Sequence, residues 1–234
     1  MTKDAIFVIE GTDGSGKSEH TSLVTQWLLA QGYRVAGFDF PQYSSPSAKL
    51  VEDYLAGRFG STPESVPPYV ASSFYAMDRY AAAPAMRRAI SDGNIVVCNR
   101  YQASNKAHQG AKIADRAERL KFYDWLDLTE YDRLGVVRPG LTVVLHMPTA
   151  QAQLFVDQKA DREHLRGRRR DLHESDLGHL VSASRCYEEL CELFPDEYVM
   201  VECTSPDGEL LDIATINQSV CSAIAPHLPP LPEN

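Results

Sequence analysis

Short apolar runs recur along the chain, separated by longer stretches with helical periodicity. The runs are apolar at nearly every position, as is typical of parallel strands that helices cover on both faces. Strands that alternate with helices indicate an α/β domain built on a parallel sheet. The runs predict five strands, at residues 5–10, 34–40, 94–98, 141–147 and 197–203.

Two of the helical stretches have clear boundaries. The first begins near Gly16 and ends at Gly32, since glycine readily adopts the left-handed conformation of a helix cap. The second follows Ser175 and stops at Pro195, which cannot continue a helix. Together with the five strands, these helices predict a sheet flanked by helices.

No repeat or linker interrupts this pattern, and 234 residues suit one medium-sized domain. We therefore expect a single domain over residues 1–226, followed by a proline-rich, frayed tail over residues 227–234. No apolar run approaches the roughly 20 residues that span a bilayer. We expect a cytoplasmic protein without a membrane partner.

The formal net charge of −9 argues against a general nucleic-acid binder, which needs a basic face to displace counterions. It does not exclude phosphorylated substrates, because a local arginine cluster can dominate the field in a cleft. The five cysteines are odd in number and lack Cys-x-x-Cys spacing, so they predict reduced, mainly structural thiols. The histidines lack metal-ligand spacing, and we expect no zinc.

The most specific local signal is Gly-Thr-Asp-Gly-Ser-Gly-Lys-Ser at residues 11–18, which fits Gly-x4-Gly-Lys-[Ser/Thr] between a strand and a helix. Such glycines let backbone N–H groups wrap a phosphate at a helix N-terminus. Lys17 would bridge the β- and γ-phosphates of ATP, and the Ser18 hydroxyl would ligate Mg²⁺. The predicted ATP-binding residues are Gly11, Gly14, Ser15, Gly16, Lys17, Ser18 and Glu19.

A chance match in a strand-turn-helix is the alternative interpretation of this loop. The loop alone indicates only a nucleoside triphosphate, since GTPases, motor ATPases and small-molecule kinases share it. A short, single-domain chain favours a small-molecule kinase.

Further motifs occur in a fixed order after the loop. They include Phe-Pro at residues 40–41, an aromatic-x-x-x-Arg element at residues 75–79, Asn-Arg-Tyr at residues 99–101, and an arginine-rich segment at residues 161–176. With them the chain resembles a thymidylate kinase from residue 6 to about residue 223. The resemblance implies a P-loop nucleoside monophosphate kinase fold with a small lid at about residues 159–175. It also implies transfer of the γ-phosphoryl group of ATP to dTMP with Mg²⁺, in a homodimer.

The resemblance assigns roles on the acceptor side. Asp13 would accept a hydrogen bond from the 3′-hydroxyl, Tyr75 would stack on the pyrimidine, Arg79 would donate to a base carbonyl, and Arg100 would hold the monophosphate. The full implied acceptor set is Asp13, Phe40, Pro41, Tyr75, Arg79, Arg100, Ser104, Asn105 and Gln109.

Each of these roles has a structural alternative. Tyr75 could be an ordinary core aromatic, and Arg79 could be a surface partner of Asp78. For Arg100 the functional interpretation is favoured, because it follows a buried strand at the carboxyl end, where ligands bind open α/β sheets.

Phosphoryl transfer also needs cations around the transferred group. The family supplies an arginine from the phosphate loop or from the lid, and here Gly14 follows Asp13, so the loop supplies none. We therefore expect lid arginines to act with Lys17 and Arg100 in catalysis, with Arg166 and Arg168 as first choices. The lid arginines are Arg162, Arg166, Arg168, Arg169 and Arg170. A solvated basic surface is the alternative interpretation.

Two positions depart from the family pattern. Asn99 replaces the expected Asp before Arg100, and His146 replaces an expected Asp at the end of the fourth strand. Asn99 can still contact Mg²⁺ through a bound water but lacks the negative charge that favours the cation. The departures leave two alternatives open: a kinase for another or a 5-modified pyrimidine deoxynucleoside monophosphate, or a catalytically impaired nucleotide-binding homologue.

Overall fold

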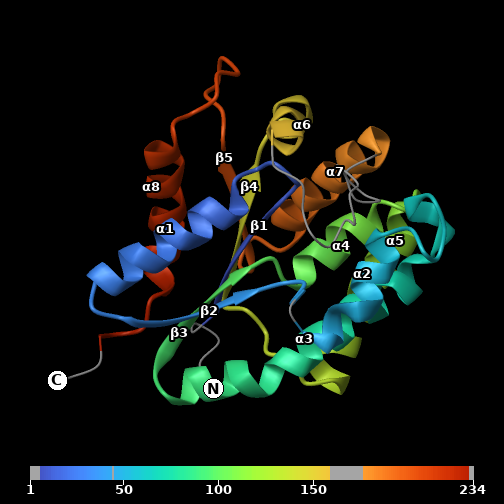
Figure 1. The fold of residues 1–234 in the computed structure, drawn as a ribbon. Helices are drawn as coiled ribbons and strands as arrows, with labels where there is room; N and C mark the ends of the chain where they lie inside the picture. The colour runs from blue at the N-terminus through green and yellow to red at the C-terminus, as the bar shows by residue number, and fades with distance from the viewer. Residues whose placement is uncertain (1–5, 44, 159–175, 232–234) are drawn as a thin grey trace.

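The computed structural model describes residues 6–231 apart from residue 44 and residues 159–175. Its centre is a five-stranded, all-parallel sheet in the order β2-β3-β1-β4-β5 (Figure 1). The strands are β1 Ile6–Gly11, β2 Arg34–Asp39, β3 Asn94–Asn99, β4 Leu141–His146 and β5 Tyr198–Glu202. The predicted fold class and all five predicted strands are confirmed.

The central strand β1 is buried along its whole length. Its side chains alternate between two cores, because successive residues of a strand point to opposite faces. Phe7 and Ile9 pack with residues of α1 and α8, whereas Ile6 and Val8 pack with residues of α3. Helices thus cover both faces of the sheet.

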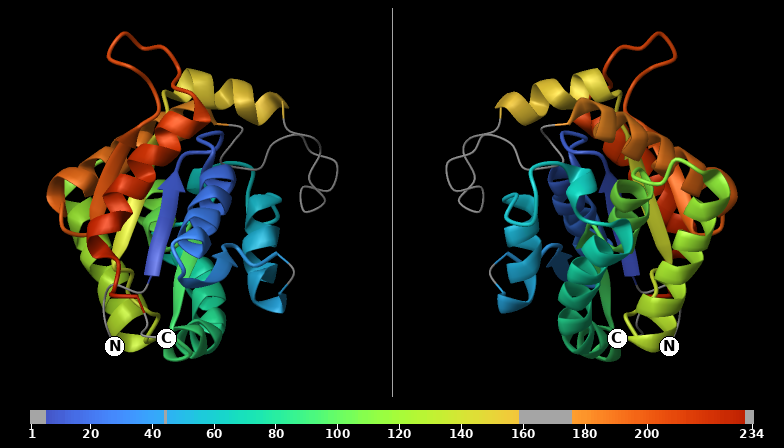
Figure 2. Two further views of the ribbon diagram at one scale, coloured as in Figure 1. Left: turned by 90° about the vertical axis from the view of Figure 1, so that its left-hand side faces the viewer. Right: turned by 90° about the vertical axis from the view of Figure 1, so that its right-hand side faces the viewer.

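The helices form two outer layers (Figure 2). On one face lie α1 Lys17–Ala30 and α8 Ile213–Ile224, which contact each other. The other face carries α3 Pro68–Ser91, α4 Gln102–Gly110, α5 Arg116–Asp127 and α7 Leu177–Leu193. The remaining helical segments are η2 Pro46–Ala48, α2 Lys49–Leu55, η3 Pro63–Ser65, the π-helix η4 Leu128–Arg133, α6 Thr149–Gln158 and η6 Ala225–His227.

Aspartates fix the starts of several helices. The Asp115, Asp176 and Asp212 side chains accept hydrogen bonds from backbone N–H groups in the first turns of α5, α7 and α8. These caps satisfy N–H groups that have no partner within the helix. Among the described helices, none is both long and apolar enough to cross a membrane.

Strand β2 departs from the expected pattern. The sequence predicts a strand buried on both faces, but every residue from Arg34 to Asp39 is at least partly exposed. The reason is topological, since β2 lies at the edge of the sheet and pairs only with β3. The strand also ends at Asp39, one residue before the predicted end.

The predicted lid, residues 159–175, lies outside the described residues. The division into one domain and a frayed tail stays a prediction. Within the described part of that tail, the Tyr33 hydroxyl donates to the Pro229 carbonyl at 2.8 Å, and Leu228 packs against the core on the α1 face. The five cysteines are free thiols, and three of them are buried.

Candidate functional site

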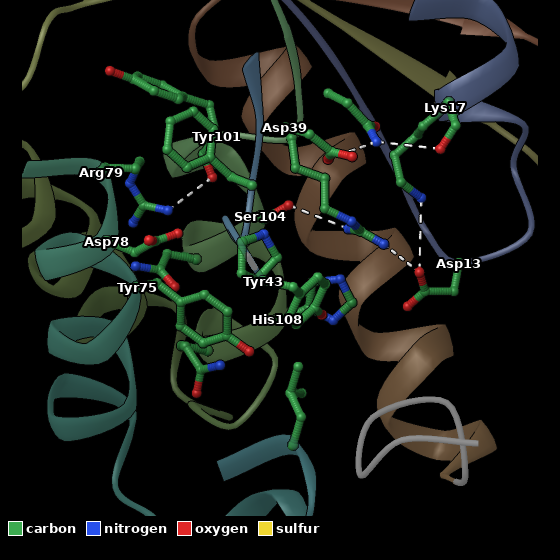
Figure 3. Close-up of a pocket in the computed structure, with 18 of the residues that line it drawn as sticks. Asp13, Lys17, Asp39, Tyr43, Tyr75, Asp78, Arg79, Tyr101, Ser104 and His108 are labelled. Carbon is green, nitrogen blue, oxygen red and sulfur yellow. Dashed lines mark hydrogen bonds and ion pairs between the residues drawn. The ribbon is translucent and has the colours of Figure 1, made fainter. Parts of the chain in front are cut away.

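A cavity of about 450 Å³ opens at the carboxyl ends of β1, β2 and β3. Because these strands are parallel and adjacent, their last residues share one edge of the sheet, which is where ligands bind in open α/β folds. Residues of the phosphate loop, of α3 and of α4 line this cavity (Figure 3). Fifteen predicted residues are among its lining: Asp13, Gly14, Gly16, Lys17, Ser18, Glu19, Phe40, Pro41, Tyr75, Arg79, Asn99, Arg100, Ser104, Asn105 and Gln109.

The phosphate loop is a tight turn into α1. Gly14 and Gly16 adopt φ values of +86° and +85°, which residues other than glycine rarely adopt. A Cβ on Gly14 would lie 2.0 Å from the Ala152 carbonyl oxygen of α6, so this position has room only for hydrogen. The loop therefore depends on glycine for its conformation and for its packing under α6.

Lys17 is almost fully buried at the start of α1. Its ammonium donates to the Thr12 carbonyl at 2.7 Å and lies 3.8 Å from Asp13 Oδ1. The loop itself thus holds the cation in place. The Ser15 hydroxyl beside it is buried and has no hydrogen-bond partner among the described residues.

Arg100 follows β3 and has φ +62°, the only positive φ among the described non-glycine residues. Its guanidinium donates to Asp13 Oδ1 and, at 3.3 Å, to the Ser104 hydroxyl. Burial alone would lower the pKa of Arg100, but the Asp13 carboxylate and other acidic neighbours raise it above its ordinary value. A permanent cation therefore joins the phosphate loop to α4.

Glu10, which the sequence analysis did not single out, positions this region. Its buried carboxylate accepts four hydrogen bonds: Tyr101 N at 2.7 Å, Ser104 N at 3.0 Å, Ser104 Oγ at 2.8 Å and Tyr187 Oη at 2.8 Å. Two of these donors are backbone N–H groups at the start of α4, where the helix dipole also favours an anion. An acidic residue inside an apolar strand was the signal that could have revealed it.

Arg79 is buried rather than exposed, so the interpretation as a surface partner of Asp78 is wrong. Its Nε and Nη2 donate to the two Glu130 carboxylate oxygens at 2.6 and 2.7 Å. Its Nη1 donates to the Tyr101 carbonyl at 3.3 Å. Glu130 comes from η4 and was not predicted; it holds Arg79 at the cavity wall.

The rest of the acceptor side combines an aromatic ring with amides. Tyr75 is half-buried and faces the cavity (Figure 3). Its ring meets the Tyr54 ring edge-to-face with centroids 6.3 Å apart. Asn105 donates to the Ser72 carbonyl at 3.1 Å. Both amide atoms of Gln109 are buried and have no hydrogen-bond partner among the described residues. Such an amide is poised to pair with a polar ligand, because an unsatisfied buried group is costly.

Six further lining residues were not predicted as site residues: Asp39, Tyr43, Leu55, Asp78, Tyr101 and His108. Asp78 accepts hydrogen bonds from Gln42 N at 2.8 Å and Ser47 Oγ at 2.5 Å, so it shapes the loop after β2. His108 stacks on His179 with ring centroids 5.7 Å apart. Burial, followed by the neighbouring His179 and Arg100, holds the pKa of His108 well below its ordinary value.

Oxygen donors for a divalent cation gather beside the phosphate loop. Asn99 Nδ2 donates to Asp39 Oδ1 at 2.9 Å and to Ser18 Oγ at 3.2 Å. Asn99 Oδ1 is buried and accepts no hydrogen bond from the described residues. Burial raises the pKa of Asp39, against the opposing effects of Arg100 and the Asn99 amide. Hydroxyl, amide and carboxylate oxygens fit a hard cation such as Mg²⁺.

His146 lies apart from this cavity. At the end of β4, it contacts Glu202 at 2.8 Å and Glu188 at 3.2 Å. Arg166, Arg168 and the other lid arginines lie outside the described residues. Gly11 and Ser15 belong to the loop but not to the cavity lining.

Comparison with known proteins identifies the lineage. A family model described as thymidylate kinase matches residues 9–212. The chain belongs to the thymidylate kinase family. It is 30% identical over 186 residues to the thymidylate kinase of Mycobacterium tuberculosis (strain ATCC 25618 / H37Rv), covering 79% of this chain and 85% of that one.

More distant members extend the likeness. The human thymidylate kinase is 28% identical over 150 residues, which are 64% of each chain. A solved structure of the thymidylate kinase from Candida albicans superposes with a TM-score of 0.67 at 21% identity, covering 96% of this chain and 93% of that one. At that identity the superposition supports the fold alone.

Proposed function

We propose that this chain is an ATP-dependent dTMP kinase that produces dTDP and ADP. The observation that carries the proposal is the meeting of two half-sites at the Asp13–Arg100 pair. A phosphate loop with Lys17 lies on one side of the pair, and a pocket with an aromatic ring and amides lies on the other. This arrangement suits a donor triphosphate and an acceptor monophosphate that react between them.

The chemistry needs positioning and charge stabilisation rather than a general base, because a phosphate oxygen of the acceptor is already largely deprotonated near neutral pH. Lys17 and the loop N–H groups would hold the β- and γ-phosphates. Arg100 would hold the acceptor phosphate and aim its oxygen at the γ-phosphorus. Arg166 and Arg168 are proposed to add positive charge from the lid.

Mg²⁺ bound with ATP would neutralise phosphate charge, and Ser18 with Asn99 would hold it, Asn99 through water. The donors described above fit this ion. Ser18 would supply a hydroxyl oxygen to the site, and Asn99 a carbonyl oxygen.

Acceptor recognition would fall to the far side of the cavity. Tyr75 would stack on the pyrimidine, and Arg79, fixed by Glu130, would donate to a base carbonyl. The buried amide of Gln109, which has no hydrogen-bond partner among the described residues, would read the base and sugar with Asn105 and Ser104. Asp13 would accept a hydrogen bond from the 3′-hydroxyl, and Phe40 and Pro41 would complete the wall.

An ADP-release assay with ATP, Mg²⁺ and a panel of dTMP, dUMP, UMP, dCMP and dGMP tests the proposal. The expected result is fast turnover with dTMP. Preference for another pyrimidine would preserve the mechanism and overturn the acceptor assignment. ATP binding without turnover on any acceptor would favour the catalytically impaired homologue.

We also propose a homodimer, supported by an exposed face of α3. Val70, Met77 and Tyr80 are 47%, 41% and 51% exposed and recur at helical spacing. Such a face on a soluble chain is suited to a second copy. Size-exclusion chromatography with light scattering should give twice the chain mass, and Met77→Glu should reduce it to a monomer.

The free thiols suit a reducing compartment, and we propose the cytoplasm.

A further inference from the structure

The carboxylate nearest the Ser18 hydroxyl in the hydrogen-bond network comes from β2 rather than β3. Asp39 and Asn99 are register partners at the carboxyl ends of these neighbouring strands. The Asn99 amide bridges Asp39 Oδ1, at 2.9 Å, and Ser18 Oγ, at 3.2 Å. Figure 3 shows the Asp39 side chain directed toward the side of the cavity that holds Lys17.

Glu19, which also lines the cavity, is exposed on the first turn of α1. The remaining acidic side chains around the cavity are committed elsewhere. Glu10 accepts four hydrogen bonds from Tyr101, Ser104 and Tyr187. Asp13 is paired with Arg100 and lies near Lys17. Asp78 accepts hydrogen bonds from the segment that follows β2. Asp39 also lies in the field of Arg100 and Lys17, but its carboxylate accepts a hydrogen bond from the neutral Asn99 amide that also touches Ser18. Its negative charge is therefore placed where a cation would be held.

We propose that Asp39 supplies the negative charge of the Mg²⁺·ATP site, with Asn99 as its amide partner. This inference rests on the proposed phosphoryl transfer from ATP. It explains how the chain functions with an amide at the end of β3. The carboxylate is present but lies one strand away.

The pairing also explains why residue 99 is an amide. A carboxylate at both positions would place two like charges about 3 Å apart, and one of them would resist ionisation. An amide instead donates to Asp39 and keeps a carbonyl oxygen for the cation or its water. The two residues thus form a complementary pair, in which Asp39 supplies the negative charge and Asn99 supplies the hydrogen-bond donor.

Reciprocal exchange of the two side chains tests the proposal. The variants are Asp39→Asn, Asn99→Asp and the double exchange, with Glu118→Gln as the control for loss of a distant surface charge. The readout is the affinity of a non-hydrolysable ATP analogue by calorimetry, with Mg²⁺ and with EDTA. This readout does not depend on turnover or on any acceptor.

Asp39→Asn should weaken the Mg²⁺-dependent binding by roughly 10–100-fold, the usual cost of losing a group that supports a metal site. Its binding in EDTA should be unchanged or tighter. Asn99→Asp should fail to improve on the parent protein, and the double exchange should recover most of the loss. The control should behave like the parent.

Unchanged Mg²⁺ dependence in Asp39→Asn would overturn the proposal, as would a double exchange no better than Asp39→Asn. Failure of the proposed function gives a different pattern. A chain whose Mg²⁺-dependent analogue binding needs Asp39, but which phosphorylates no acceptor, would retain the metal assignment and lose only the kinase activity.

Discussion

Arg79 of α3 and Glu130 of η4 form a buried ion pair through two parallel contacts of 2.6 and 2.7 Å. Fork-shaped pairing of this kind fixes the plane of the guanidinium as well as its position. Within the proposed function, this pairing orients the Arg79 guanidinium before the acceptor binds, so that it can donate to the base carbonyl.

Glu130→Gln should therefore impair both stability and acceptor binding. Removing one charge leaves Arg79 buried without compensation, which typically costs about 3–5 kcal/mol. Urea unfolding should show this loss, and the KM for dTMP should rise while the KM for ATP changes little. The double variant Arg79→Met with Glu130→Leu should regain stability but not dTMP affinity. Recovery of both would show that the pair is purely structural.

Arg100→Lys should reduce turnover without harming ATP binding. Lysine keeps the charge but loses the planar fork that contacts both Asp13 and Ser104. Loss of one well-placed donor typically costs roughly 10²–10³-fold in rate. Steady-state kinetics should place the loss in kcat/KM for dTMP. A fall in ATP affinity of similar size would assign Arg100 to the donor side instead.

Glu10→Gln should displace the start of α4. The carboxylate accepts four hydrogen bonds, and an amide replaces one acceptor oxygen with a donor that faces other donors. An unsatisfied buried group of this kind costs about 1–3 kcal/mol. Tyr187→Phe, which removes one donor only, is the matched control and should lose less. Equal losses in the two variants, measured by thermal unfolding, would contradict the positioning role.

Stability should fall as the pH decreases from about 6.5 toward 4. Burial is the main cause that lowers the pKa of both stacked histidines, to about 4 for His179 and well below the ordinary value for His108. In this window the unfolded chain binds protons that the folded chain refuses, so each histidine contributes a slope of about 1.4 kcal/mol per pH unit. Above pH 6.5 both states are neutral at these positions and the penalty is absent.

His179→Asn provides the comparison for this pH dependence. Removing one of the two titrating groups should make the loss of stability between pH 6.5 and 5 clearly shallower in urea unfolding. The slope of each protein is compared with itself, so a general destabilisation of the variant does not obscure the result. Identical slopes would mean that His179 takes up its proton equally in both states.

Local patterns predicted the sheet and the phosphate loop well. Apolar runs locate β1, β3, β4 and β5, because strands buried on both faces leave a continuous signal. The loop motif predicts a turn between a strand and a helix, and the structure has this turn, with Lys17 and Ser18 lining the cavity. The motif is informative because the positive φ values of the turn require glycine. The edge position of β2 was not predicted, because the order of strands in a sheet does not follow from local sequence.

The residues that sequence reasoning missed act across long separations. Glu130 lies 51 positions from Arg79, and Glu10 lies 177 positions from Tyr187. No spacing rule joins such pairs, so Arg79 was as easily interpreted as a surface residue. Asp39 was not predicted for the same reason, because its proposed role depends on a hydrogen bond from Asn99 on the adjacent strand.

The most direct test of the central claim follows the phosphoryl group itself. ATP labelled in the γ-phosphate is incubated with dTMP, Mg²⁺ and the protein, and the products are separated to find the label. The dTMP kinase proposal predicts labelled dTDP that forms with time, and a rate reduced by roughly 10³-fold or more in folded Lys17→Ala, which lacks the phosphate-bridging cation. Label that stays in ATP or is released only as phosphate, with the folded parent protein, would contradict it.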